Sequence, residues 1–222
     1  MRTLAVLDVA GGRVVSAGGG DRAAYPPLAL PDGAVDPAAI ARRLLAEPGV
    51  DGLYVADLDA LEGGPPQPCV AEIAGATDVV WVDGGYRSVA GVAEAPGRPV
   101  IASECWPGPA SLMDALVRRP GAVFSLDLRG GRLVAPGAWP ADPLAAASLA
   151  VNAGVRTLLV LDVLSVGGGE CGTLPLCGQL AAMHPHVAVA TGGGLRLETP
   201  APGVSARLIG GDLHRRIGLR AV

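Results

Sequence analysis

The chain has no lysine, because all 17 of its basic residues are arginines. This absence excludes catalysis through a lysine Schiff base, a route that many phosphosugar aldolases on barrel scaffolds need. Aromatic residues make up only 3% of the 222 residues, and the formal net charge is −4. Because there is neither a basic block nor an aromatic stacking surface, we expect no nucleic-acid partner.

Long apolar runs are also missing, and none reaches the roughly 18 residues that span a bilayer. An aspartate interrupts the first apolar run, so the amino terminus is not typical of a signal peptide. The four cysteines form no C-x-x-C pair, which favours reduced thiols. We therefore expect a cytoplasmic protein without a membrane partner.

Histidine is scarce as well, and the three histidines are His184, His186 and His214. A His-Pro-His segment at the end of a predicted helix is typical of a solvated loop. We therefore expect no metal site.

Half of the residues are hydrophobic, and they concentrate in short runs of Val, Leu, Ile and Ala. The segment 122–134 joins such a run to an aspartate, a glycine pair and an arginine, and the segment 4–15 has the same design. Three further pairs of segments follow in the same order: 53–64 with 158–169, 79–87 with 187–196, and 100–104 with 208–212. This internal repeat predicts two half-barrels, at about 1–120 and 121–222.

Eight short apolar runs alternate with mostly helical segments, which predicts a single (β/α)8 barrel domain over residues 1–222. A doubly wound sheet is the alternative, but it explains neither the eight units nor the repeat. The predicted strands are 4–9, 52–56, 79–82, 99–102, the apolar part of 122–134, 157–161, 187–190 and 206–209. The glycine- and proline-containing loop 18–35 is long enough to cover an active site.

Active sites of such barrels lie at the carboxyl ends of the strands, where five aspartates fall in this chain. These are Asp8, Asp57, Asp83, Asp127 and Asp162. For any one of them, capping of the following loop or helix is the alternative role. The repeat places Asp8 and Asp127 on opposite sides of one opening, a spacing that suits an acid and a base acting on one substrate.

Glycine clusters follow the last two predicted strands. They are Gly192, Gly193 and Gly194 after the seventh strand and Gly210 and Gly211 after the eighth. Their backbone N–H groups are suited to an anion, and loops at this place are the common phosphate site of barrels. We therefore expect a phosphorylated small-molecule substrate.

The motifs LAVLDVAGGRVV, LYVADLDAL, FSLDLRGGRLV, ATGGGLR and RLIGGDL occur in this order along essentially the whole chain. In sequence and spacing they resemble the histidine-biosynthesis barrel family, above all its ProFAR isomerase branch (phosphoribosylformimino-aminoimidazole carboxamide ribotide). The resemblance implies that Asp8 is the general base and Asp127 the general acid of an Amadori-type aldose–ketose isomerisation. It also implies that no cofactor is needed.

The chain departs from the family pattern inside the expected site. Ser16, Tyr54 and Leu161 stand where the family usually has arginine, histidine and threonine. The further departures are Asp83, Gly84 and Gly85 for a glycine triplet, Ser103 and Glu104 for glycine-threonine, Val166 and Gly167 for Asp-Gly, and Asp212 for a small residue. Asp83 and Glu104 would repel a phosphate dianion by about 1 to 4 kcal/mol per contact. We expect Asp57, Asp83, Gly84, Gly85, Glu104 and Asp162 to shape a substrate pocket that holds one phosphate.

Three functions remain open at this point. The first is the histidine-pathway isomerase itself. The second is a divergent paralogue with another phosphorylated substrate, for which related barrels imply one-carbon carrier biosynthesis (tetrahydromethanopterin or methanofuran). The third is a non-catalytic binding or scaffold protein. A homo-oligomer is compatible with each of them.

Overall fold

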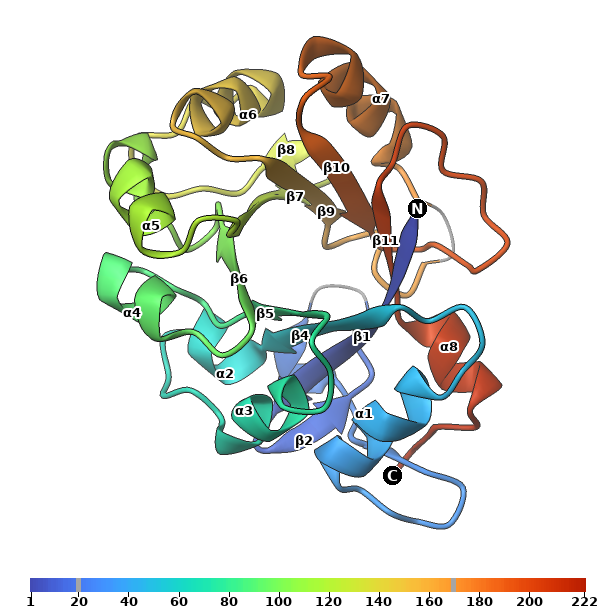
Figure 1. The fold of residues 1–222 in the computed structure, drawn as a ribbon. Helices are drawn as coiled ribbons and strands as arrows, with labels where there is room; N and C mark the ends of the chain where they lie inside the picture. The colour runs from blue at the N-terminus through green and yellow to red at the C-terminus, as the bar shows by residue number, and fades with distance from the viewer. Residues whose placement is uncertain (19–20, 169–170) are drawn as a thin grey trace.

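The computed structural model describes residues 1–18, 21–168 and 171–222, and eight parallel strands form a closed ring within them (Figure 1). The ring contains β1 (Arg2–Ala10), β4 (Gly52–Asp57), β5 (Val80–Asp83), β6 (Arg98–Ala102), β7 (Val123–Arg129), β9 (Thr157–Asp162), β10 (Ala188–Gly192) and β11 (Ala206–Ile209). β1 pairs with β4 on one side and with β11 on the other, which closes the ring. The predicted (β/α)8 barrel is therefore confirmed, and the doubly wound alternative is wrong. Gly19 and Gly20 of the predicted cover loop and Gly169 of the repeat lie outside the described residues.

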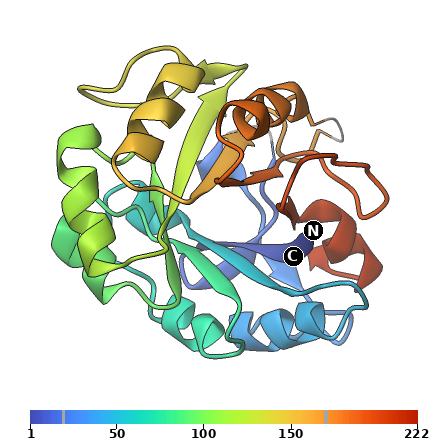
Figure 2. The same ribbon diagram turned by 45° about the horizontal axis from the view of Figure 1, so that its top comes forward.

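Helices connect most strands and lie outside the ring in both views (Figures 1 and 2). They are α1 (Pro37–Leu45), α2 (Leu58–Leu61), α3 (Pro68–Ala74), α4 (Val89–Glu94), α5 (Leu112–Arg118), α6 (Pro143–Asn152), α7 (Leu174–Met183) and α8 (Gly211–Arg216). α1 and α6 begin where an Asp-Pro pair predicts them, because Asp36 and Asp142 each accept two backbone N–H groups of the first turn. The connection from β10 to β11 is described throughout and contains no helix, as its prolines predict. Among the described residues, no helix has the length and apolar character needed to cross a membrane.

The repeated aspartate–glycine–glycine–arginine design forms a hairpin in each half of the ring. β1 turns into β2 (Arg13–Val15), and β7 turns into β8 (Arg132–Leu133), in both cases as an antiparallel pair. The two central residues of each turn are glycines with φ values of 54° and 73° in the first hairpin and 60° and 76° in the second. A two-residue turn with both φ values positive is type I′, which explains why glycine occupies all four positions.

Alternate residues of each ring strand face opposite layers. On β4, Tyr54 and Ala56 pack into the interior of the ring, whereas Leu53 and Val55 pack outward in the layer that contains α1 and α3. The same alternation holds for the other strands, because side chains of a strand repeat with a period of two. A side chain at the carboxyl end of a strand therefore faces the barrel opening only if it lies an even number of residues from an interior side chain of that strand.

The loop after β2 is anchored at its base. It contains η1 (Arg22–Ala24) and β3 (Leu28–Ala29), and β3 pairs with the carboxyl-terminal strand β12 (Arg220–Ala221). A second anchor is the backbone hydrogen bond that the Ser16 N–H donates to the Pro26 carbonyl. The described part of the predicted cover loop therefore projects over the barrel from a fixed base.

Candidate functional site

A cavity of about 820 Å³ opens at the carboxyl ends of the strands. Side chains or backbone from the ends of β1, β5 and β7 line it, together with the loops that follow β2, β6, β9, β10 and β11. The cavity lies where barrel active sites are generally found. It is large enough for a small-molecule substrate.

Asp8 and Asp127 both line this cavity and lie on opposite walls. In the ring, three strands separate β1 from β7 in either direction, so the two strands face each other across the barrel. Asp8 continues the interior row of Leu4 and Val6, and Asp127 continues that of Val123 and Ser125. The structure therefore brings both sequence-predicted residues to one opening.

The pKa values of both carboxyl groups are raised. Burial raises the pKa of Asp8 to about 7, although the positive charge of Arg22 opposes this rise. Burial and the neighbouring charge of Glu104 raise the pKa of Asp127, while the hydroxyl of Ser125 opposes that rise. A carboxyl group that titrates near neutral pH can exchange a proton with a substrate.

Asp127 is held by groups from three directions. The Ser125 hydroxyl donates to Asp127 Oδ1 at 2.7 Å, and the Glu104 backbone N–H donates to Oδ2 at 3.3 Å. Ser103 Oγ lies 3.1 Å from Oδ2 and accepts the Asp127 backbone N–H at 2.9 Å. These contacts fix the orientation of the carboxylate, and Ser103 and Glu104 take part in them although they depart from the family pattern.

Asp83 is the most strongly perturbed carboxyl group of the cavity. Its side chain is only 3% exposed, and the Tyr54 hydroxyl of the neighbouring strand donates to Asp83 Oδ2 at 2.9 Å. Asp83 Oδ1 is buried without a hydrogen-bond partner. Burial, followed by the charges of Asp127 and Glu104, raises the pKa of Asp83 to about 8.

The two glycines after Asp83 form a loop that packs closely against the backbone of α2. Gly85 has a φ of 59°, and a Cβ atom there would lie 2.4 Å from the Ala60 carbonyl oxygen. The Arg87 guanidinium donates to the carbonyl groups of Ala60 at 2.9 Å and Gly85 at 2.7 Å, and also to that of Leu61. Gly84 and Gly85 do not line the cavity. Their loop packs against α2.

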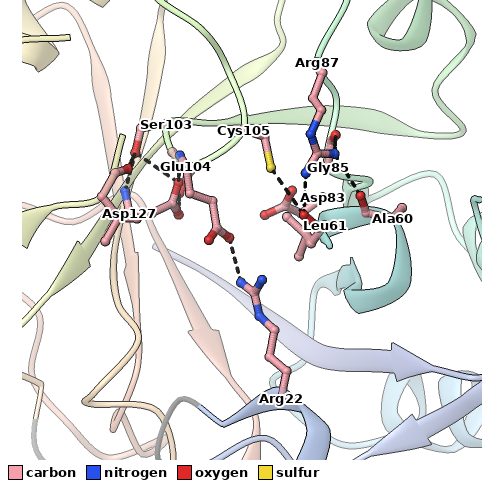
Figure 3. Close-up of polar contacts among 12 residues, drawn as sticks. Arg22, Ala60, Leu61, Asp83, Gly85, Arg87, Ser103, Glu104, Cys105 and Asp127 are labelled. Carbon is pink, nitrogen blue, oxygen red and sulfur yellow. Dashed lines mark hydrogen bonds and ion pairs between the residues drawn. The ribbon is translucent and has the colours of Figure 1, made fainter. Parts of the chain in front are cut away.

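Arg22 is a site residue that sequence reasoning missed. Its Nη2 forms an ion pair with Glu104 Oε1 at 2.7 Å, which joins the loop after β2 to the end of β6 (Figure 3). Both side chains line the cavity and are partly buried. The signal available in the sequence was that Arg22 is the single basic residue of the predicted cover loop.

The glycine clusters after β10 and β11 form the side of the cavity that lies across the ring from β5 and β6. Gly193, Gly194, Gly210 and Gly211 line it, and Gly193 and Gly194 have left-handed backbone angles. Arg196 and Arg215 line the same side, and a Cβ atom on Gly211 would lie 3.4 Å from Arg215 Nη1. Backbone N–H groups and guanidinium groups together favour an anion here.

The charge of Asp212 on this side is compensated. Asp212 Oδ2 accepts the Leu197 backbone N–H at 3.1 Å, and its carboxylate forms ion pairs with Arg215 at 3.5 Å and Arg216 at 3.6 Å. The departure at Asp212 therefore leaves the anion-binding character of these loops in place.

Besides Gly84 and Gly85, three further predicted residues do not line the cavity: Asp57, Asp162 and Gly192. Asp57 and Asp162 follow interior Ala56 and Leu161 directly, so the strand period turns them away from the opening. Asp57 accepts the N–H groups of Ala60 and Gln67, and Asp162 accepts those of Gly130, Gly131 and Leu164. Gly192 packs below the cavity, where a Cβ atom would lie 2.8 Å from that of Leu208.

Two of the histidines form hydrogen bonds with groups other than the carboxyl groups of the site. His184 Nε2 is 3.2 Å from the Ser148 hydroxyl, whereas His214 lines the cavity with its Nε2 2.8 Å from the Val6 carbonyl oxygen. Within the described ranges, no group of three or more His, Cys, Asp or Glu side chains is placed to hold a metal ion.

Comparison with known proteins identifies one family for nearly the whole chain. The model of the family described as "Histidine biosynthesis protein" matches residues 2–215. No curated protein matches the chain.

Proposed function

This chain belongs to the histidine biosynthesis protein family, and we propose that it catalyses acid–base chemistry on a small molecule that carries one phosphate group. The observation that carries this proposal is the placement of Asp8 and Asp127 on opposite walls of one cavity, each with a raised pKa. Two carboxyl groups on opposite sides of a substrate can remove a proton at one end and deliver one at the other.

In this proposal Asp8 is the general base and Asp127 the general acid. With a pKa of about 7, Asp8 is partly ionised at neutral pH and basic enough to accept a proton from carbon. The raised pKa of Asp127 increases the fraction that carries a proton for a ring or carbonyl oxygen. Ser125 orients this carboxyl group and keeps its pKa from rising further. The product of such steps is an isomer of the substrate.

The single phosphate would bind at the side formed by Gly193, Gly194, Gly210 and Gly211, where Arg196 and Arg215 supply positive charge. The opposite side is unsuited to a second phosphate, because Asp83 and Glu104 line it and its glycine loop packs against α2. The Glu104 carboxylate would repel a dianion by about 1 to 4 kcal/mol, and Asp83, with a pKa of about 8, is largely protonated at pH 7 and offers no positive charge. ProFAR has a phosphate at each end, so we favour a divergent substrate over the histidine-pathway reaction.

Genuine ProFAR isomerase activity is the second candidate, because the family and the aspartate pair both favour it. Arg22 supports it further, since it brings a guanidinium into the site from the loop in which family members usually carry one. The two candidates differ in the substrate group that the ends of β5 and β6 bind: ProFAR requires a second phosphate there, whereas the divergent substrate does not.

A two-part experiment tests the proposal. In the first part, thermal shifts are compared for inorganic phosphate, ribose phosphate and ProFAR. Stabilisation by phosphate and ribose phosphate without a further gain for ProFAR supports a divergent substrate, whereas a clear preference for ProFAR supports the isomerase. No response to any of the three contradicts a phosphate site.

In the second part, ProFAR turnover and that of any phosphosugar that stabilises the protein are measured for the wild type, Asp8→Asn and Asp127→Asn. We expect either substitution to abolish turnover and to leave the circular dichroism spectrum unchanged. Full turnover in both variants contradicts the assignment of the pair. A wild type that binds but converts none of the ligands indicates the binding or scaffold role.

A further inference from the structure

The charged groups that line the cavity are divided between its two sides. Arg196 and Arg215 come from the loops after β10 and β11, where Asp212 also lines the cavity and is paired with Arg215 and Arg216, and Arg129 comes from the end of β7. Glu62, Asp83 and Glu104 lie on the other side, after β4, β5 and β6. Arg22 is the basic residue that reaches this acidic side, and it is paired with Glu104. A ligand that spans the cavity therefore meets positive charge at one end and carboxyl groups at the other.

Asp83 is a buried acidic group of the cavity that is only partly compensated, by the Tyr54 hydroxyl, the Gly85 backbone N–H and the charge of Arg22. One oxygen accepts the Tyr54 hydroxyl, and the other, Oδ1, is buried and has no partner. An unpartnered buried acceptor carries the cost of its lost hydration, and a ligand donor that reaches it removes this cost. Because Asp83 lines the cavity, such a donor can reach it from the bound substrate.

We propose that the Asp83 side of the cavity binds a protonated amine of the substrate, so that the substrate is an aminophosphate with the amine at β5 and β6 and the phosphate at β10 and β11. This inference rests on the proposed function, because the phosphate site orients the ligand. An ammonium group offers three donors and one positive charge. Asp83 Oδ1 is the acceptor without a partner, and Glu104 and Asp127 are the nearby charges that favour a cation over a neutral hydroxyl.

Amine binding would displace a proton. Burial and the charges of Asp127 and Glu104 raise the pKa of Asp83 to about 8, whereas the Tyr54 hydroxyl and the Gly85 backbone N–H oppose this rise, so the free protein holds the carboxyl group largely protonated at pH 7. Arg22, Tyr86 and Cys105 also lie near enough to interact with its charge. A bound ammonium lowers that pKa and expels the proton to the buffer. Binding of an aminophosphate at pH 7 should therefore release up to about one proton more than binding of a phosphate without the amine.

Isothermal titration calorimetry tests the proposal with a series of aminoalkyl phosphates and hydroxyalkyl phosphates of matched chain length, and with inorganic phosphate as reference. We expect the best aminoalkyl phosphate to bind about tenfold or more tightly than its hydroxyl counterpart, the effect of one charge-assisted hydrogen bond. Titrations in two buffers of different ionisation enthalpy should show the extra proton release for the amine alone.

Asp83→Asn removes the charge and keeps the size of the side chain. In this variant the amine preference and the extra proton release should disappear, while the affinity for inorganic phosphate stays within about threefold, since the phosphate side is unchanged. Glu72→Gln, an exposed carboxylate on α3, is the matched control and should leave the preference intact. Asp83→Ser replaces Asp83→Asn if the latter does not fold.

The outcomes separate the two proposals. Equal affinities for the amino and hydroxyl ligands, or a preference that survives loss of the Asp83 carboxylate, overturn the amine site and leave the phosphate site standing. If the aminoalkyl phosphates, the hydroxyalkyl phosphates and inorganic phosphate all fail to bind, the phosphate site is overturned, and the amine site with it. An amine preference with Asp83-dependent proton release supports both.

Discussion

The guanidinium of Arg22 and the carboxylate of Glu104, which lie 82 positions apart in the chain, form an ion pair of 2.7 Å over the barrel opening. The pair joins the loop after β2 to the end of β6. Arg22 also lowers the pKa of Asp8, so one side chain links the cover loop to both walls of the cavity.

Replacement of Arg22 tests this link. In Arg22→Ala, loss of the positive charge should raise the pKa of Asp8 above about 7, because burial then acts without opposition. Carbon-detected NMR titration of the Asp8 carboxyl group measures the change. The free energy of unfolding should fall by less than about 1 kcal/mol, since partly exposed ion pairs contribute little. Arg118→Ala on the exposed face of α5 is the control, and an unchanged Asp8 pKa in Arg22→Ala contradicts the link.

The stability of the protein should decrease as the pH rises from about 4 to 8. Asp8 and Asp83 have pKa values of about 7 and 8 in the folded protein, against 3.8 for an ordinary aspartate side chain, so the folded state holds protons that the unfolded state has released. Each excess proton lowers the free energy of unfolding by about 1.4 kcal/mol per pH unit over this range.

Urea denaturation at pH 5 and pH 8 measures this slope. Asp83→Asn should flatten the slope and be more stable than the wild type at pH 8, because the amide needs no proton. A wild type that is equally stable at both values, or a variant with the wild-type slope, would show that Asp83 is ionised in the folded protein.

The hairpin of the second half depends on Asp162. Its carboxylate accepts the N–H groups of Gly130, Gly131 and Leu164 at 2.8 to 3.0 Å. Asp162→Ala should lower the free energy of unfolding by about 2 to 4 kcal/mol, since three partly buried donors lose a charged acceptor.

The first half supplies the matched control. Asp59 accepts one N–H group, that of Gly11 at 2.8 Å in an exposed position, so Asp59→Ala should cost about 1 kcal/mol or less. Chemical denaturation compares the two variants. Equal losses would mean that the hairpin turns do not depend on the number of hydrogen bonds.

Replacement of Gly193 should weaken phosphate binding in addition to lowering the stability of the protein. Its φ is 86°, and a Cβ atom would lie 3.2 Å from the Asp162 carbonyl oxygen, so Gly193→Ala should shift the loop that lines the cavity. Gly203→Ala has a similar φ of 77° but lies outside the cavity lining.

Both alanine variants should lose about 1 kcal/mol of stability through backbone strain. We expect only Gly193→Ala to lose affinity for inorganic phosphate, by about tenfold, the effect of one charge-assisted hydrogen bond. Calorimetry measures this affinity, and equal affinities in the two variants would place the phosphate elsewhere.

The positions of the strands, and the side of each strand that faces the barrel opening, depend on local chemistry and could therefore be predicted from the sequence. Short branched runs, Asp-Pro helix starts and paired glycines act over a few residues, and the repeat then places Asp8 opposite Asp127. The strand period also separates Asp83, which faces the opening, from Asp57 and Asp162, which do not. That last distinction was available in the sequence and was not drawn from it.

By itself, the sequence determined the eight-stranded barrel, the two hairpins and the end of the barrel at which the carboxyl groups gather, because these follow from local periodicity and turn geometry. Only the tertiary structure decided which groups meet there. The contact of Arg22 with Glu104, the bond from Tyr54 to Asp83 and the packing of the Gly85 loop against α2 join distant segments. Such contacts depend on side-chain directions in a closed barrel, and so do the raised pKa values that follow from burial.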